Sequence, residues 1–128
     1  MKCGLAIRNL LLQQEINLSH IYEEPLKQFD ERTAIPVEDI QGDILFIYAK
    51  KDNMCPSGQA VKYMMDRLEK HGFAFRVDGI AYEKASHILV PLHPSQLKMF
   101  KVERQYPEEC RHSREDAFMK TVEWIGLR

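Results

Sequence analysis

Asp52, Cys55 and His87 are the residues of this sequence whose types and positions best fit chemical work. Asp52 and Cys55 lie with Ser57 just after an apolar run, where they could form a turn, a metal-ligand set or part of a catalytic site. A carboxylate that holds an imidazole through Nδ1–H leaves Nε2 free to act as a base. The alternative is that Asp52 is an ordinary turn residue and that His87 merely packs before the apolar residues that follow it.

The elements around these residues decide whether they can meet. Residues 44–49 are apolar at almost every position, which is typical of a strand in a parallel sheet covered by helices on both sides. An amphipathic helix follows and ends at His71 and Gly72, and a second strand runs to Tyr82. A strand, a helix and a strand with short connections make the two strands parallel, so Asp52 and His87 should face each other at the carboxyl edge.

The whole chain of 128 residues is predicted to be one α/β domain. Residues 1–42 form a helical lead-in and connector, and residues 43–91 form the strand-helix-strand unit that carries the acid and the histidine. Residues 92–112 read as a loop that is long enough to be a flap or to contain a short helix. Residues 113–126 form a final helix, capped by Ser113, with a buried stripe made of Phe118, Val122 and Ile125.

Composition disfavours several classes of partner. The net charge is −1, from 18 basic and 19 acidic residues, which disfavours nucleic acid and anionic membranes as partners. Without an apolar stretch of membrane-spanning length, and with an odd number of cysteines, the chain is predicted to be soluble and cytoplasmic. No cofactor and no metal are expected, since Cys110 and His112 make a weak zinc pair. The histidines without a predicted partner are His20, His93 and His112.

Four segments, 35–45, 52–57, 67–73 and 82–89, together resemble the C-terminal part of α/β-hydrolases of the acyl-CoA thioesterase and bile acid-CoA:amino acid N-acyltransferase family. The resemblance covers roughly residues 22–91 and rests on the order and spacing of the segments. It implies a partial α/β-hydrolase fold and an acyl-CoA or ester substrate. It also implies that Asp52 and His87 are the acid and histidine of a nucleophile–His–Asp triad. The chain departs from the family at Ala49 and Ser86, where glycines are usual, and at Cys55, where an aromatic residue is usual.

The nucleophile elbow of such hydrolases, G-x-[SC]-x-G, is missing, because no two glycines stand four positions apart. Cys55 is a candidate replacement, but it lies on the acid's own loop, and a small buried residue is the commoner role of a free cysteine. One hypothesis is therefore a hydrolase without its N-terminal half, inactive alone or acting as one half of a split enzyme. The other is a non-catalytic binding or assembly module. In both cases two strands with exposed edges should be completed by a homo-oligomer or by the missing half.

Overall fold

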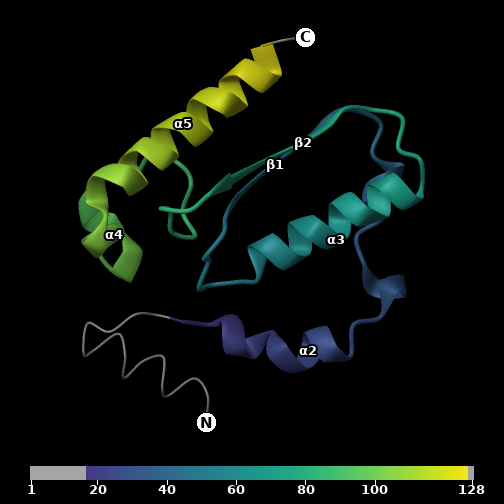
Figure 1. Ribbon diagram of the computed structural model, residues 1–128, viewed down its shortest axis with the longest axis horizontal. Coiled ribbons are helices and arrows are strands. Elements are labelled where there is room, and N and C mark those ends of the chain that lie inside the picture. The colour runs from purple at the N-terminus through teal and green to yellow at the C-terminus, as the bar shows by residue number, and fades with distance from the viewer. Residues whose placement is uncertain (1–16, 127–128) are drawn as a thin grey trace.

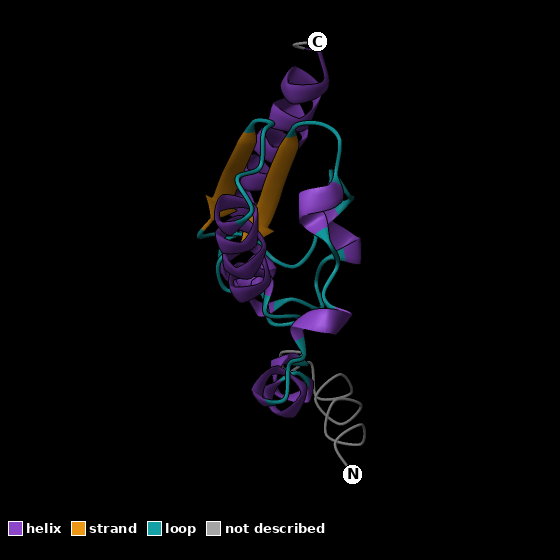
Figure 2. Ribbon diagram, turned by 90° about the vertical axis from the view of Figure 1, so that its right-hand side faces the viewer, coloured by secondary structure: helices purple, strands orange, loops and turns teal. Residues whose placement is uncertain are grey.

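Two parallel strands form the centre of the protein in the computed structural model, which describes residues 17–126. Strand β1 spans Ile44–Ala49 and strand β2 spans Val77–Tyr82, paired in register from Ile44 opposite Val77 to Ala49 opposite Tyr82. Helix α3, Ser57–Lys70, connects them, and helix α5, Pro107–Gly126, lies on the other side of the strands (Figures 1 and 2). The predicted strand-helix-strand unit with parallel strands is confirmed.

Helix α3 follows from an apolar stripe that faces the sheet. Val61 and Leu68, two turns apart, are buried, while Lys62 and Asp66 form an exposed ion pair one turn apart on the other side. The helix ends where Gly72 takes a left-handed conformation with φ of 62°. A residue with a Cβ is strained there, so the predicted role of Gly72 in terminating the helix is confirmed.

Strand β1 is less buried than the sequence indicates. Only Ala49 is fully buried, and Ile44 to Tyr48 are half-buried. The described sheet has two strands, so β1 has a neighbour on one edge and none on the other. Helices cover both faces, as predicted, but no third strand among residues 17–126 pairs with the free edge of β1.

The region after β2 contains more helix than the sequence indicates. A 3₁₀ turn spans Pro94–Gln96, helix α4 spans Lys101–Gln105, and α5 begins at Pro107 instead of Ser113. Proline at a first helical position loses no hydrogen bond, and the two glutamates that follow it suit the positive end of the helix dipole. Ser113 does not cap the helix, because its hydroxyl donates to the Lys84 carbonyl at 2.8 Å.

The apolar stripe predicted to bury the last helix is instead exposed. Phe118, Val122 and Ile125 are 50%, 48% and 66% exposed. The buried residues of α5 are Cys110, Arg114 and Ala117, all of which precede Phe118 along the helix. The two described strands therefore leave the C-terminal part of α5 without cover.

The segment before β1 consists of short helical turns. They are the 3₁₀ turns Ser19–Ile21, Glu31–Thr33 and Val37–Asp39 and the helix α2, Glu23–Lys27. The part of the predicted helical lead-in that precedes residue 17 lies outside the described residues. Val37 is buried, and Glu38 forms a bidentate ion pair with Arg67 of α3, which fastens the connector to the strand-helix-strand unit.

This ion pair predicts a pH dependence of stability. The hydrogen bonds from Arg67 lower the pKa of Glu38 from its ordinary 4.5 to about 2. A carboxyl group whose pKa is lower in the folded state stabilises the fold fully above its ordinary pKa and loses this contribution as the pH falls toward the folded value. Between pH 4.5 and 2, the thermal unfolding temperature should therefore fall more steeply for the native chain than for Glu38→Gln. Parallel slopes in circular-dichroism melts would contradict the prediction.

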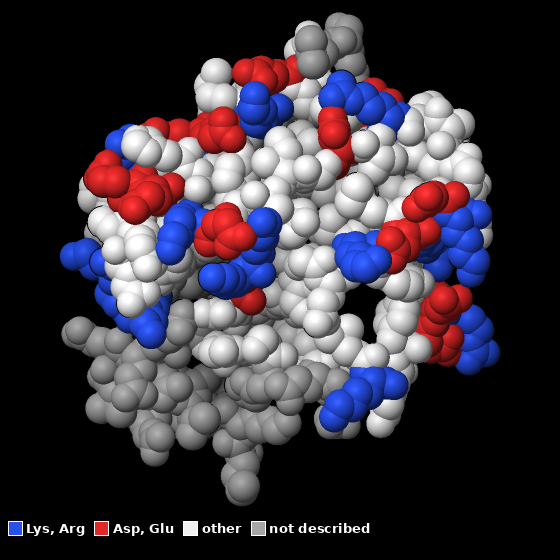
Figure 3. Space-filling model, viewed as in Figure 1, with Lys and Arg blue, Asp and Glu red and all other residues white. Residues whose placement is uncertain are grey.

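Charge is mixed over the protein's surface. On the face seen in Figure 3, basic and acidic side chains stand beside one another, without a large area of one sign. Within residues 17–126, no helix combines the length and the apolar character that crossing a membrane requires.

Candidate functional site

Asp52 and His87 meet at the carboxyl ends of the two strands, as the parallel topology requires. Asp52 lies in the loop between β1 and α3, and His87 lies in the loop after β2. The Nδ1 atom of His87 is 2.8 Å from Oδ2 of Asp52. A neutral histidine in this position donates from Nδ1–H to the carboxylate, so the pair has the geometry that sets a tautomer with a free Nε2.

The Asp52 carboxylate is held by its own loop. The Met54 amide donates to Oδ1 at 2.8 Å, the Cys55 amide donates to the same oxygen at 3.3 Å, and the Ser57 hydroxyl donates to Oδ2. The side chain is 4% exposed. Burial alone would raise the pKa of Asp52, but the hydrogen bonds from Ser57, His87 and Met54 outweigh it and hold the pKa below its ordinary value. Asp52 is therefore held as an anion, and the same carboxylate makes both the turn contacts with Met54 and Cys55 and the contact with His87.

His87 is the open member of the pair. Its side chain is 40% exposed, and among the described residues Nε2 has no hydrogen-bond partner. An imidazole that is fixed at one nitrogen and accessible at the other can take a proton from a group that approaches from outside.

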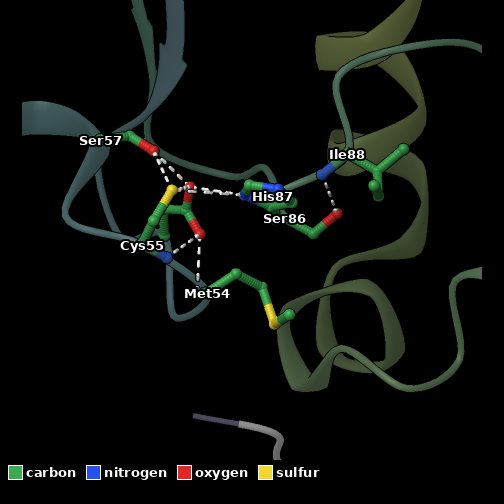
Figure 4. A network of polar contacts seen from close by, with 7 residues as sticks. Met54, Cys55, Ser57, Ser86, His87 and Ile88 are labelled. Atoms are coloured by element: carbon green, nitrogen blue, oxygen red, sulfur yellow. Dashed lines mark hydrogen bonds and ion pairs between the residues drawn. The ribbon is translucent and has the colours of Figure 1, made fainter. Parts of the chain in front are cut away.

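Cys55 lies against the pair, on the side of Nδ1. Its Sγ is 3.4 Å from Oδ2 of Asp52, 3.2 Å from Oγ of Ser57 and 3.8 Å from Nδ1 of His87 (Figure 4). Burial raises the pKa of the thiol, and the Asp52 carboxylate adds to this effect, while the contact with Ser57 offsets part of it. Cys55 is thus near the histidine but faces the nitrogen already used by Asp52, and its environment favours the thiol over the nucleophilic thiolate.

A buried polar network of Ser86, Glu103 and Arg114 holds the loop that carries His87. The hydroxyl of Ser86 donates to Oε1 of Glu103 at 2.7 Å, and Nη1 of Arg114 lies 2.6 and 2.5 Å from the two Glu103 oxygens. The side chains of Glu103 and Arg114 are 6% and 3% exposed. The network joins α4 and α5 to the residue directly before the histidine.

Sequence reasoning missed this network and also the hydroxyl of Ser57. Glutamate and arginine spaced 11 positions apart in a polar stretch give no periodic signal, because ordinary exposed helices contain such pairs. Ser86 had a weak signal, as a serine where the resembled family usually has glycine. The structure shows what the extra side chain contacts.

The remaining predicted positions do not join the site. Cys110 is fully buried and its thiol is 3.6 Å from the Val102 carbonyl oxygen, whereas His112 is exposed, so the two do not form a zinc pair. His93 is exposed and contacts Ser95 of its own turn. The side chain of His20 lies outside the described part of the structure.

Comparisons with known proteins identify relatives over most of the chain. Residues 6–106 match the family described as BAAT / acyl-CoA thioester hydrolase C terminal. Acyl-coenzyme A amino acid N-acyltransferase 1 of Mus musculus is 32% identical over 89 residues, covering 66% of this chain and 21% of that protein. Acyl-coenzyme A amino acid N-acyltransferase 2 is 36% identical over 66 residues in Mus musculus and over 70 residues in Rattus norvegicus. These matches cover 50% and 53% of this chain, and 15% and 16% of those proteins. The matched segments thus span about a fifth or less of each relative. No solved structure matches the chain significantly.

Proposed function

Because the chain belongs to the BAAT / acyl-CoA thioester hydrolase C-terminal family, we propose that it supplies the acid and the histidine of a site that transfers acyl groups from CoA thioesters. Asp52 is the acid and His87 is the general base. The observation that carries the proposal is the 2.8 Å contact between Oδ2 of Asp52 and Nδ1 of His87, with Nε2 left accessible. The names of the relatives, which are acyl-CoA amino acid N-acyltransferases, support a thioester as the substrate.

The proposed reaction proceeds in two steps. Nε2 of His87 takes the proton of a nucleophile as it bonds to the acyl carbon, and the proton then passes to the CoA sulfur as the carbon–sulfur bond breaks. In the second step His87 takes a proton from the acceptor, either water or an amine, as the acceptor bonds to the acyl carbon. His87 then returns this proton to the nucleophile as the bond between the nucleophile and the acyl carbon breaks. Asp52 stays ionised throughout and stabilises the imidazolium that forms in each step.

We further propose that the nucleophile comes from outside this chain, and that the isolated chain is inactive. The sequence has no glycine pair that could form an elbow, and the sulfur of Cys55 lies on the Nδ1 side of the histidine as a thiol of raised pKa. A working nucleophile must reach Nε2 and must stand beside oxyanion-hole donors. Both requirements point to a partner that approaches the exposed side of His87.

A chimera tests the proposal. The part of acyl-coenzyme A amino acid N-acyltransferase 1 that precedes its matched segment is joined to this chain, and thioester cleavage is followed by release of free CoA thiol. The chimera should cleave acyl-CoA, the isolated chain should not, and His87→Ala should remove the activity of the chimera. A chimera that shows a cooperative melt but no activity would count against acyl transfer. Turnover by the isolated chain would count against an external nucleophile.

A second candidate function is a non-catalytic assembly module. It is favoured by the free edge of β1 and by the exposed apolar face of α5, since two-stranded sheets are poorly stable alone. On this view the sheet is completed by a second copy of the chain. Light scattering of the purified chain should then give the mass of a dimer or a larger oligomer, and a well-folded monomer would exclude self-completion of the sheet.

A further inference from the structure

The site places three different kinds of metal ligand together. The sulfur of Cys55, the Nδ1 atom of His87 and a carboxylate oxygen of Asp52 lie within 4.8 Å of one another. Figure 4 shows Cys55 and His87 approaching each other from two loops. Asp52 and Cys55 come from one loop and His87 from the other, so a shared ligand would link the ends of both strands.

The distances between these atoms are close to those around a tetrahedral zinc ion. With a zinc–sulfur bond of about 2.3 Å and zinc–nitrogen and zinc–oxygen bonds of about 2.0–2.1 Å, tetrahedral angles separate sulfur from nitrogen by about 3.6 Å and nitrogen from oxygen by about 3.3 Å. The observed separations are 3.8 Å from Sγ to Nδ1 and 3.4 Å from Sγ to Oδ2. The 2.8 Å from Nδ1 to Oδ2 must widen, and exchanging a hydrogen bond for a bridging ion does this.

We propose that Asp52, Cys55 and His87 bind a thiophilic divalent cation of the zinc class, and that this ion competes with the acid–histidine pair. Thiolate and imidazole select zinc or cobalt over magnesium and calcium, which prefer oxygen ligands alone. Binding releases the thiol proton to solvent and forms a sulfur–metal bond. The Nδ1 proton of His87 moves to Nε2, and Nδ1 then bonds to the metal and no longer donates to Asp52. The ion therefore blocks the nitrogen that acts as the base.

The binding of the ion goes beyond the proposed function and does not depend on it, whereas its competition with the acid–histidine pair rests on that function. A carboxylate and a histidine alone would serve a hydrolase, and Cys55 is not needed by the mechanism proposed above. Cys55 adds the soft third ligand, beside a carboxylate that is almost fully buried. The partly exposed His87 leaves a side from which an ion can enter, and three protein ligands leave a fourth position for water.

Cobalt provides a test with a readout other than activity. Co²⁺ is added to the full chain after treatment with a chelator, and the near-ultraviolet charge-transfer absorption from thiolate sulfur to cobalt is recorded. The native chain should develop this absorption at one equivalent of Co²⁺, and Zn²⁺ should abolish it by displacement. Cys55→Ser should remove the absorption and weaken Zn²⁺ binding. Loss of a residue that only contacts a metal ligand lowers affinity by roughly 10- to 100-fold, and the loss of Cys55, a direct ligand, should lower it by more.

Matched thiol variants make the result specific. Cys110→Ser removes a buried cysteine far along the chain, and Cys3→Ser removes the remaining thiol, so both should retain the absorption. His87→Gln should lower the affinity for Zn²⁺, and its partly exposed position makes it the variant to use if circular dichroism shows that Cys55→Ser does not fold. The proposal is overturned if the native chain does not develop the absorption. It is also overturned if the absorption survives in Cys55→Ser, or if it is lost in Cys110→Ser or Cys3→Ser.

Discussion

Asp52→Asn is expected to lower acyl-CoA turnover in the chimera by about 10⁴-fold, the loss that the equivalent change causes in serine-protease triads. The carboxylate accepts from Nδ1–H of His87 at 2.8 Å and so keeps the proton on that nitrogen. An asparagine can present its NH₂ group to Nδ1 instead, which favours the tautomer with the proton on Nε2. The base is then blocked at the nitrogen that must accept the proton, and the imidazolium loses its anionic neighbour.

Two further measurements separate this cause from simple unfolding or metal binding. Nitrogen NMR of the ring should show Nδ1 protonated in the native chain and a shift toward Nε2–H in Asp52→Asn. Asp66→Asn, which changes an exposed aspartate paired with Lys62 on α3, should leave both turnover and tautomer unchanged. The assays contain a chelator, so that an ion bound at the same residues does not contribute. An unchanged tautomer in Asp52→Asn would contradict the role given to Asp52.

The meeting of Asp52 with His87 could be predicted from sequence because it depends on few facts. A parallel crossover brings the ends of its two strands to one edge of the sheet, whatever the details of packing. The amphipathic pattern of residues 60–68 and the position of Gly72 were enough to identify that crossover. The contact between two loops follows from topology, although their residues are 35 positions apart.

The sequence did not predict which face of the last helix is buried, because burial depends on what the rest of the fold places against each face. The stripe containing Phe118 and Val122 has the period of a buried helix face, but the described sheet offers nothing wide enough to cover it. One turn before Phe118, α5 instead buries Arg114, a residue that composition and periodicity assign to solvent. Hydrophobic patterning predicts which helix faces are apolar, but it does not predict whether another part of this chain packs against them.

The buried pair of Glu103 and Arg114 yields the largest expected change in stability. Arg114→Met should lower the free energy of unfolding by about 3–5 kcal/mol, because it leaves the Glu103 carboxylate buried without its cation. The side chains are 6% and 3% exposed, so water does not replace the lost partner. Urea unfolding followed by circular dichroism measures the difference. Arg111→Met is the matched control on the same helix. Arg111 pairs with Glu108 and Glu115 while 42% exposed, so its loss should leave the free energy of unfolding nearly unchanged.

The double variant Glu103→Leu with Arg114→Met separates folding from positioning. Without a stranded charge, it should recover most of the stability that Arg114→Met loses, because apolar side chains can replace a buried ion pair at little cost. Ser86 then loses its acceptor, since its hydroxyl donates to Oε1 of Glu103 at 2.7 Å. If the network serves only to stabilise the fold, the double variant in the chimera should turn over acyl-CoA as the native sequence does. We expect the turnover of the double variant to be lower than that of the native sequence, and the NMR signals of the His87 ring to be broader. The reason is that Ser86, the residue before the histidine, is no longer anchored to α4 and α5.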